Sequence, residues 1–336
     1  MSAEHSPAYR LNDLMTGYWK TQAISVTARL GIVDAVAHER LSSADLAEKL
    51  AVDRDSLHRL LLFLVTLGVL SGDERTGYAA TEVGELLRVD NPGTMAHYAK
   101  IYGDEFYTAW GHLEGSVRTG KSAFSLAYGQ ELFPYLQSHP ETSLSYERAM
   151  IAGANFFGEV DTVYPFPETG LVVDIAGGHG LLLRQILAKR PELRGMLFDR
   201  PQVIAEAKEH GFLGDFADRC TLVAGDIFET APTGGDIYLM SRLLHCFDDA
   251  GCLALLGNCR DAFATGTRLL IVERLLPEDG QVSLTPGYNM HMLAVMGQGR
   301  ERTRSQFADL LAQTGFRLDG AHALPLDAYV LAATRV

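Results

Sequence analysis

Apolar positions in the second half of the chain fall into short β-branched runs that alternate with longer runs of helical spacing. The short runs, bounded by glycines or polar turns, are typical of buried strands. Strands that alternate with helices imply a parallel sheet covered by helices. The sequence therefore predicts an α/β fold, with a Rossmann-like domain over residues 161–336. The expected strands span residues 171–175, 195–199, 220–224, 235–240, 267–273 and 328–334.

The pattern in the first half is helical almost throughout. Ser42 or Ser43 can cap one helix, and Asp53 can begin another, whose leucines recur at helical spacing up to Gly68. A hairpin with a polar turn at 71–77 follows, and Thr81 can then cap a helix through Leu87. Helix, helix, hairpin is the order of a winged helix-turn-helix. The predicted domains are a mostly helical winged-helix domain over residues 1–100 and a helical linker with substrate-side residues over 101–160.

Composition narrows the possible partners. The chain has 336 residues and a net charge of −13, which argues against nucleic acid or an anionic membrane as a partner. It contains no run of about 18 uncharged apolar residues, so no transmembrane helix is expected. The first residues lack the basic and apolar regions of a secretory signal. We therefore expect a cytoplasmic protein with free thiols.

A winged helix raises the alternative of a DNA-binding regulator. The candidate recognition helix carries Arg54, His58 and Arg59, but also Asp53 and Asp55, and no basic cluster flanks it. A DNA-binding protein should present a basic face. The charge pattern favours a winged helix that serves dimerisation and closes an active site, and the regulator stays a remote alternative.

A glycine turn, Gly177-Gly-His-Gly180, follows the strand over 171–175 and precedes a helix. Glycines let a backbone approach a ligand closely, and a helix N-terminus adds free N–H groups. The spacing is not that of the dinucleotide fingerprint. Asp199 ends the next strand, where an acidic residue can accept both hydroxyls of a ribose, and Asp226 follows the third strand, where it suits an adenine amine. Together these features favour S-adenosylmethionine over NAD; a turn that only tightens packing is the alternative.

Candidate catalytic chemistry centres on His245. It follows the strand over 235–240, and Glu273 ends the strand over 267–273, so both belong to the same edge of the sheet. A carboxylate beside a histidine fixes its tautomer and raises its basicity, which is the pattern of a general base. Removal of a phenolic proton would create a nucleophile for the cofactor's methyl group, with no need for a metal. A structural role is the alternative for this histidine.

These motifs resemble those of the S-adenosylmethionine-dependent O-methyltransferases of the caffeic acid/hydroxyindole type, especially bacterial members that modify aromatic natural products. Residues 172–180 and 195–204 are similar to the family's cofactor signature, 225–228 to its adenine-side motif, and 244–249 to the segment that carries its base. The resemblance implies a class I methyltransferase domain, an N-terminal dimerisation domain, a homodimer and a role in antibiotic or other secondary metabolism.

The resemblance also implies site residues. His245 would be the base, and Glu273 and Glu301 would orient and polarise it, with no metal ligand. S-adenosylmethionine, which leaves as S-adenosylhomocysteine, would be held by Asp174, Gly177, Gly178, Gly180, Asp199, Arg200, Gly225, Asp226, Ile227, Phe228, Ser241 and Arg242. A small hydroxylated aromatic substrate would contact rings and methionines, which suit flat molecules, although a core position is the alternative for each. These substrate-side candidates are Tyr102, Phe106, Trp110, Met150, Phe156, Asn289 and Met292.

Some positions depart from the family's pattern. Ala176 stands where the family has the first of three glycines, Cys246 and Phe247 replace an Asp-Trp pair, and Ser241 and Asn289 stand where relatives often carry lysine and aspartate. The alternative function is therefore an enzyme of the same fold that binds S-adenosylmethionine but catalyses hydroxylation, decarboxylation or a pericyclic step. The presence of the base and both of its carboxylates favours methyl transfer.

Overall fold

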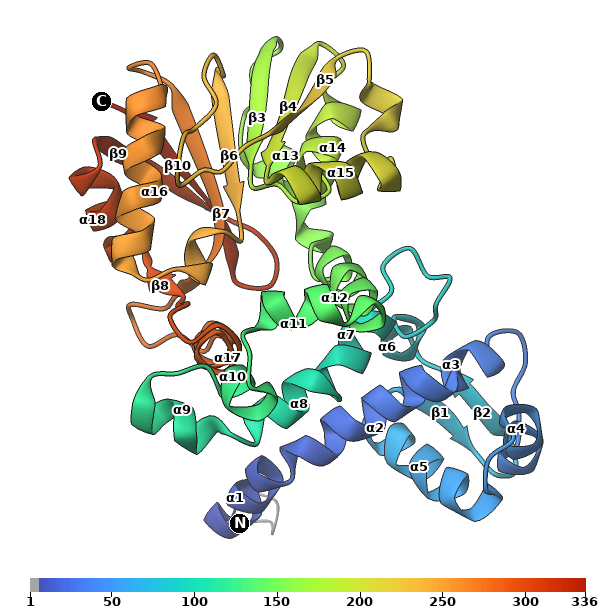
Figure 1. Ribbon diagram of the computed structural model, residues 1–336. Helices are drawn as coiled ribbons and strands as arrows, with labels where there is room; N and C mark the ends of the chain where they lie inside the picture. Colours follow the sequence, from blue (N-terminus) through green and yellow to red (C-terminus); the bar gives the residue numbers. More distant parts are fainter. Residues whose placement is uncertain (1–5) are drawn as a thin grey trace. The chain divides into compact units, whose positions relative to one another are not determined.

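A computed structural model describes residues 6–336 (Figure 1). The chain forms two compact units. The helical unit comprises the residues up to His112 together with Ala127–Asn155, and the sheet unit comprises Leu113–Leu126 and Phe156–Val336. The three-part division at residues 100 and 160 stays a prediction.

The helical unit consists of helices and one two-stranded hairpin. Helices α4 and α5 followed by the hairpin β1–β2 make the predicted winged-helix order. The helices are α1 (Pro7–Met15), α2 (Gly17–Leu30), α3 (Ile32–Ala35), α4 (Ser43–Leu50), α5 (Arg54–Thr66), α6 (Glu82–Glu85), α7 (Ala96–Tyr102), α8 (Glu105–Trp110), α11 (Leu132–Ser138) and α12 (Pro140–Ala152). The strands are β1 (Leu70–Asp73) and β2 (Gly77–Ala80). Helix α10 (Ala123–Tyr128) and the 3-10 turn η2 (Asn155–Glu159) lie where the chain passes between the units.

The predicted helix starts in this unit are confirmed. Ser42 caps α4 in a capping box with Asp45, and the Asp53 carboxylate accepts the Ser56 N–H at the start of α5. Thr81 caps α6, which ends at Glu85, before the predicted Leu87. The predicted polar turn is also shorter than expected, because the Asp73 carboxylate accepts two backbone N–H groups of the turn and strand pairing extends to Asp73.

The end of α4 offers a test of backbone strain. Ala51 has a φ of 53° and an exposed side chain. This left-handed region costs a residue with a Cβ about 1–2 kcal/mol, but not glycine. Ala51→Gly should therefore raise the free energy of unfolding by about 0.5–1 kcal/mol, after glycine's greater unfolded-state entropy is subtracted. Thermal unfolding would measure it, and Ala44→Gly within α4 should instead lose about 0.5–1 kcal/mol. Equal losses in the two variants would contradict the argument.

Parallel strands form most of the large sheet in the sheet unit. The strands are β3 (Gly170–Ile175), β4 (Leu193–Asp199), β5 (Cys220–Ala224), β6 (Ile237–Ser241), β7 (Arg268–Leu276), β8 (Arg302–Thr303), β9 (Phe316–Ala323) and β10 (Ala328–Arg335). Its order is β5-β4-β3-β6-β7-β10-β9, and β8 pairs with the end of β7. The helices are α9 (Leu113–Thr119), α13 (Val160–Val163), α14 (Leu181–Lys189), α15 (Pro201–His210), α16 (Asp249–Ala262), α17 (Thr285–Met296) and α18 (Arg304–Gln313), with 3-10 turns η3 (Gly214–Phe216) and η4 (Leu244–Cys246).

All six predicted strands are confirmed, and the predicted parallel sheet is extended at one edge by two antiparallel strands. Pairing is parallel from β5 to β7 and antiparallel from β7 through β10 to β9. Strand β9 was not predicted, because glycine and charged residues interrupt its apolar alternation. The pairing of β9 with β10 skips Asp319, a bulge that further weakens the period.

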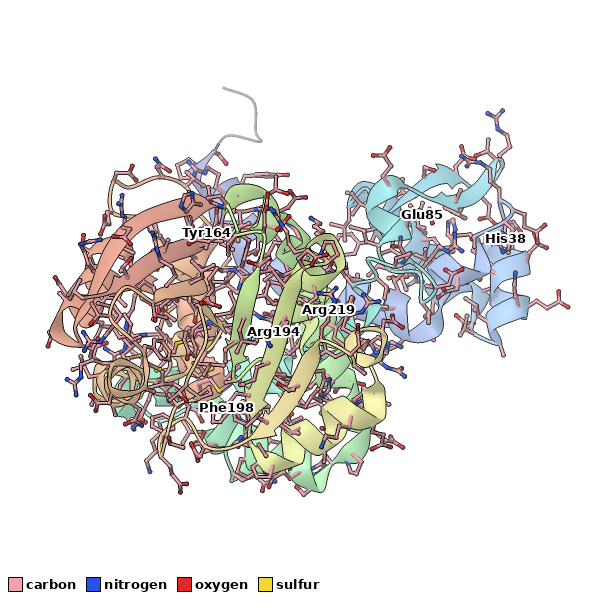
Figure 2. All side chains as sticks on the ribbon, turned by 90° about the horizontal axis from the view of Figure 1, so that it is seen from above. His38, Glu85, Tyr164, Arg194, Phe198 and Arg219 are labelled. Atoms are coloured by element: carbon pink, nitrogen blue, oxygen red, sulfur yellow. The ribbon has the colours of Figure 1, made fainter. Side chains whose placement is uncertain are left out.

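The sheet has a separate core on each face. One core cluster joins Val173 and Ile175 of β3 to apolar side chains of α16 and α18. Helices α14 and α15 contact β3, β4 and β5, and an added Cβ on Gly195 would meet Leu187 of α14 (Figure 1). Because side chains alternate along a strand, Asp174 faces the α14 side. Arg219, labelled in Figure 2 beside β4, ties α14 to β4 by donating to the carbonyls of Leu187, Arg190 and Leu193.

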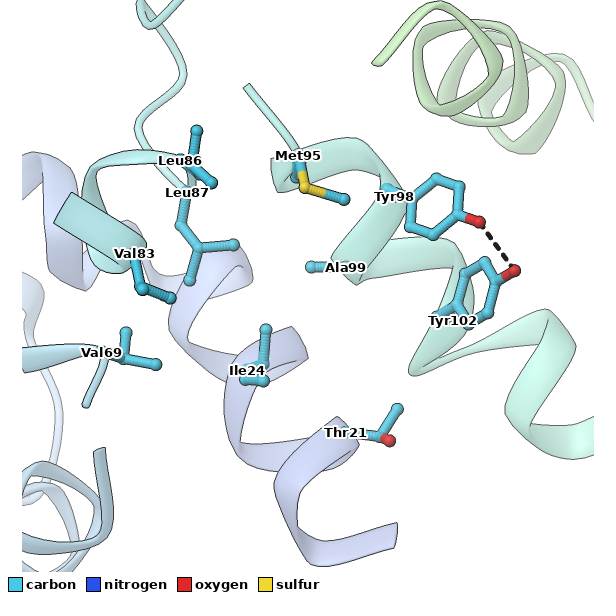
Figure 3. A pocket seen from close by; sticks show the side chains of 10 residues that line it. All are labelled: Thr21, Ile24, Val69, Val83, Leu86, Leu87, Met95, Tyr98, Ala99 and Tyr102. Carbon is cyan, nitrogen blue, oxygen red and sulfur yellow. Dashed lines mark hydrogen bonds between the residues drawn. The ribbon is translucent and has the colours of Figure 1, made fainter. Parts of the chain in front are cut away.

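The helical unit contains an apolar cavity of about 290 Å³ (Figure 3). At one side of the cavity, the hydroxyl groups of Tyr98 and Tyr102 form a hydrogen bond, with their oxygens 2.8 Å apart. The cavity is lined by Thr21, Ile24, Val69, Val83, Leu86, Leu87, Met95, Tyr98, Ala99 and Tyr102. Within residues 6–336, no helix is long and apolar enough to cross a membrane.

Candidate active site

His245 follows strand β6 and lies at the carboxyl-terminal edge of the parallel strands. After Ser241 ends β6, Arg242 takes a φ of 50° and its N–H donates to the carbonyl of Val272 on β7. A residue with a Cβ in this region is strained, and such strain gathers at functional sites. The chain then turns through η4, which carries His245.

The His245 ring lies against two buried carboxylates. Its Nδ1 is 3.2 Å from Oε1 of Glu301 and 3.3 Å from Oε2 of Glu273. The backbone N–H of His245 also donates to Glu273, at 3.3 Å. Both carboxylate side chains are 1% exposed, whereas that of His245 is 14% exposed. The structure thus brings together all three residues predicted to form the catalytic group.

This arrangement sets the protonation of the ring. Burial alone would lower the pKa of His245, but the charge of Glu273, the contacts with Cys246 and the hydrogen bond to Glu301 outweigh it and hold that pKa well above its usual value. Ionised carboxylates only accept hydrogen bonds, so they favour a proton on Nδ1. Nε2 then carries the lone pair, and the carboxylates stabilise the imidazolium that forms when it takes a proton.

A shift in the pH profile tests this electrostatic account. The base must be neutral to accept a proton, so a raised pKa moves the acidic limb of the kcat profile to higher pH. Glu273→Gln removes a negative charge, which lowers the pKa of His245, and we expect the acidic limb to move to lower pH. Steady-state kinetics across pH would measure it. Glu229→Gln, at an exposed site, should leave the limb in place, and an identical limb in Glu273→Gln would contradict the account.

Arg302 and Asn289 hold the segments that carry His245 and Glu301 in position. Arg302 is 1% exposed and donates to the carbonyl of Leu244, which begins η4, to that of Phe247, which follows η4, and to Asp249. The amide oxygen of Asn289 on α17 accepts the backbone N–H of Glu301. Sequence reasoning missed Arg302; its signal was a charged residue directly after Glu301 in a segment similar to a family motif. Asn289 was predicted as a substrate contact, and its amide oxygen is already engaged.

The glycine turn lies at the end of β3 and requires its glycines. A Cβ on Gly177 would lie 2.4 Å from the Asp174 carboxyl, and one on Gly180 would lie 2.5 Å from Leu213. Gly178 and Gly180 have φ values of 60° and 79°. Ala176, the first position of the turn, shares this left-handed backbone at φ 51° although it carries a Cβ. The turn therefore accommodates one departure from glycine at a cost in strain.

Asp199 reaches from the end of β4 to this turn. One of its oxygens accepts the Gly178 N–H at 2.9 Å and the other accepts the Arg200 N–H at 2.7 Å. Burial raises the pKa of Asp199 above its ordinary value, although both N–H groups oppose the shift. Each oxygen keeps a lone pair, so the carboxylate can accept a further pair of hydroxyls.

Asp174 lies under the turn with neither carboxylate oxygen hydrogen-bonded among residues 6–336. Its burial, reinforced by the charge of Asp199, raises the pKa of Asp174 to about 7. A buried carboxylate without donors is costly, and such groups gather at functional sites. Asp174 was predicted as a cofactor contact, and that role stays a prediction.

The predicted adenine side follows β5. Asp226 accepts the N–H of Phe228 at 2.9 Å, and a Cβ on Gly225 would meet the ring of Phe198, which Figure 2 labels on β4. Phe228 is 43% exposed, and its ring lies edge-on to Phe247 at 5.1 Å. Phe247, one of the departures, therefore belongs to an aromatic pair beside the predicted adenine site. The carbonyl of the buried Ile227 accepts the side-chain amide of Asn258.

The predicted substrate residues are divided between the units. Tyr102, Phe106, Trp110 and Met150 belong to the helical unit, and the remaining three belong to the sheet unit. Tyr102 stacks on Tyr98, with ring centroids 4.4 Å apart. Phe106 and Phe156 are 2% and 3% exposed, Met292 is 8% exposed, and Trp110 is 38% exposed. Their contact with a substrate stays a prediction.

Family models match most of the chain. An O-methyltransferase domain covers residues 110–317, and an O-methyltransferase dimerisation domain covers residues 12–90. The chain belongs to the O-methyltransferase family. This confirms the resemblance found in the sequence, and it identifies the winged-helix region as a dimerisation domain of O-methyltransferases.

Known relatives match this chain over nearly its whole length. The 3-amino-4-hydroxybenzoate 4-O-methyltransferase of Streptomyces cremeus is 51% identical, over 99% of this chain and 92% of the relative. Phenazine O-methyltransferase PhzM of Lysobacter antibioticus is 37% identical, over 92% and 91% of the two chains. The structure of human N-acetylserotonin methyltransferase in complex with S-adenosylmethionine superposes with a TM-score of 0.90 at 27% identity, over 100% and 99% of the chains.

Proposed function

We propose that this O-methyltransferase transfers the methyl group of S-adenosylmethionine to a phenolic hydroxyl of a small aromatic secondary metabolite, with His245 as general base. The observation that carries the proposal is the contact of His245 Nδ1 with two buried carboxylates, at 3.2 and 3.3 Å. That contact leaves Nε2 as the acceptor of a proton.

The residues of the sheet unit fit this cofactor. Asp174, Asp199 and Asp226 lie at the ends of three neighbouring strands, β3, β4 and β5, and together favour a cationic ligand. The two oxygens of Asp174 have no hydrogen-bond donor among residues 6–336. We assign Asp199 to the ribose hydroxyls, Asp226 and Ile227 to the adenine, and the glycine turn to the methionine part. When bound, the cofactor supplies an electrophilic sulfonium methyl group.

The reaction then requires a base and an aligned acceptor. Nε2 of His245 takes the phenolic proton, and Glu273 and Glu301 stabilise the resulting imidazolium. The hydrogen bond from Nδ1 to Glu301 holds the ring in one orientation. Arg302 anchors both ends of η4, so the ring keeps its position during proton transfer. Alignment of the phenolate with the methyl group supplies the rest of the rate enhancement.

Relatives support the substrate class and the assembly. The Streptomyces cremeus relative is named for a 4-O-methylation of an aminohydroxybenzoate, so a hydroxylated aromatic ring is the acceptor that we propose here. We also propose a homodimer that uses the dimerisation domain matched at residues 12–90. Helix α1 has no buried residue and exposes Tyr9, Leu11, Leu14 and Met15, which is apolar surface that a partner chain can cover.

A product assay tests the function. Purified protein would be incubated with S-adenosylmethionine and a panel of hydroxybenzoates, phenazinols, catechols and flavonoids, and products would be identified by mass spectrometry. We expect a product heavier by one methylene, together with S-adenosylhomocysteine in equal amount. Consumption of an acceptor with no S-adenosylhomocysteine would instead support the alternative of an enzyme that binds the cofactor without transferring its methyl group.

We propose that the reaction needs no metal. His245, Glu273 and Glu301 place ligand atoms close enough to hold an ion, but an ion there would compete with the proton on Nδ1. Dialysis against a chelator should therefore leave kcat unchanged, and added Zn²⁺ should inhibit by displacing that proton. Loss of activity after dialysis, restored by one added metal, would refute metal independence.

A further inference from the structure

A half-buried arginine near the end of β7 has no anionic partner among the described residues. Arg274 directly follows Glu273 on β7 and is half-buried. Its Nε is buried without a hydrogen bond, and within residues 6–336 its guanidinium forms no ion pair. Buried or half-buried guanidinium groups are normally paired, because an unpaired charge is costly to desolvate. An open position for an anion next to Arg274 accounts for this arrangement.

The side chain of Tyr288 orients the Arg274 guanidinium in a way that suits a planar anion. The guanidinium carbon lies 3.9 Å from the centre of the Tyr288 ring on α17. This stacking fixes the plane of the guanidinium and leaves the N–H groups along its edge to donate hydrogen bonds in that plane. A carboxylate matches that edge with two parallel hydrogen bonds.

Helix α17 connects Arg274 to the catalytic group. It packs on β7 and on η4, which carries His245. His291 of α17 is close enough to both residues that their charges, added to its burial, lower the pKa of His291 to about 4. His291 is therefore neutral at pH 7. Glu273 and Glu301, the carboxylates of the catalytic group, are engaged with the His245 ring.

We propose that Arg274, with His291 beside it, binds a carboxylate on the aromatic acceptor and so makes this enzyme selective for hydroxylated aromatic acids. The inference rests on the proposed function and deepens it, because the same molecule presents its hydroxyl to His245. The methionine carboxylate of the cofactor is the other carboxylate in the reaction. It belongs at the glycine turn on β3, which is separated from β7 by β6.

Acceptor preference provides the test. We would compare 3-amino-4-hydroxybenzoate with its carboxamide, which is neutral and nearly equal in shape. The wild type should favour the acid, and Arg274→Leu should reduce the acid-to-amide ratio of kcat/KM by about 10- to 100-fold, mainly through KM, because a charge-assisted pair is lost. Arg274→Lys, which keeps the charge but not the fork, should give an intermediate ratio. Arg268→Gln, at the exposed start of β7, should leave the ratio unchanged.

Equilibrium binding separates this inference from the function itself. Calorimetry with the S-adenosylhomocysteine-loaded enzyme should show tighter binding of the acid than of the amide, whether or not either is methylated. Arg274→Leu should abolish that difference and leave the affinity for S-adenosylmethionine intact. Equal binding of acid and amide by the wild type would overturn the proposal, as would a loss of S-adenosylmethionine affinity in Arg274→Leu. Failure of methylation alone would count against the proposed function only.

Discussion

Replacing His245 by alanine is expected to lower kcat by about 10²–10⁴-fold, the usual loss when a general base is removed. Nε2 is the nitrogen left free by the two carboxylates at Nδ1. Alanine also leaves Glu273 and Glu301 buried together without a shared proton donor. Burial and the charge of Glu301 raise the pKa of Glu273, and loss of the opposing imidazole raises it further, so Glu273 is expected to take up a proton in the variant.

The measurement is turnover by mass spectrometry, with cofactor affinity determined by calorimetry on the same preparation. Affinity for S-adenosylmethionine should change little, because the aspartates and glycines assigned to it lie at the ends of β3, β4 and β5. His38→Ala, an exposed histidine of the helical unit labelled in Figure 2, is the matched control and should keep full turnover. Near-normal turnover in His245→Ala would refute the assignment of the base.

The second large effect is expected at Asp199. Asp199→Ala should weaken S-adenosylmethionine binding by about 10²-fold or more, because two charge-assisted hydrogen bonds to the ribose are lost, each worth about 1.5–3 kcal/mol. The change also leaves the N–H groups of Gly178 and Arg200 without their acceptor, so the melting temperature should fall. Asp199→Asn keeps one acceptor oxygen, so its affinity for S-adenosylmethionine and its melting temperature should both lie between those of the wild type and Asp199→Ala.

A thermodynamic cycle separates the ribose contact from the general loosening of the turn. The wild type should bind S-adenosylhomocysteine more tightly than its 2′-deoxy analogue, and Asp199→Ala should bind the two equally. A constant ratio in both proteins would show that Asp199 acts on the turn and not on the ribose. Because the pKa of Asp199 is raised by burial, affinity should also begin to fall on acidification at a higher pH than for an ordinary aspartate.

The candidate site was only partly predictable. The strand-edge rule placed His245 and Glu273 together, since His245 follows β6 and Glu273 comes directly after the last β7 residue that pairs with β6. Glu301 is 56 positions from His245 and came only from the resemblance to a family. Arg302 was missed because a charged residue in a loop motif is normally exposed, and its burial against η4 depends on how β8 pairs with β7.

The sequence by itself determined the local structure: the helix caps at Ser42, Asp53 and Thr81, the glycine turn, and the strands whose apolar runs are continuous. These features depend on interactions between residues a few positions apart, so a short segment of sequence is enough to predict each of them. Tertiary structure alone decided the antiparallel edge of β10 and β9, the approach of the second carboxylate, Glu301, to His245, and the unpaired guanidinium of Arg274. Their energies come from burial and charge among residues that only the order of strands in the sheet brings together.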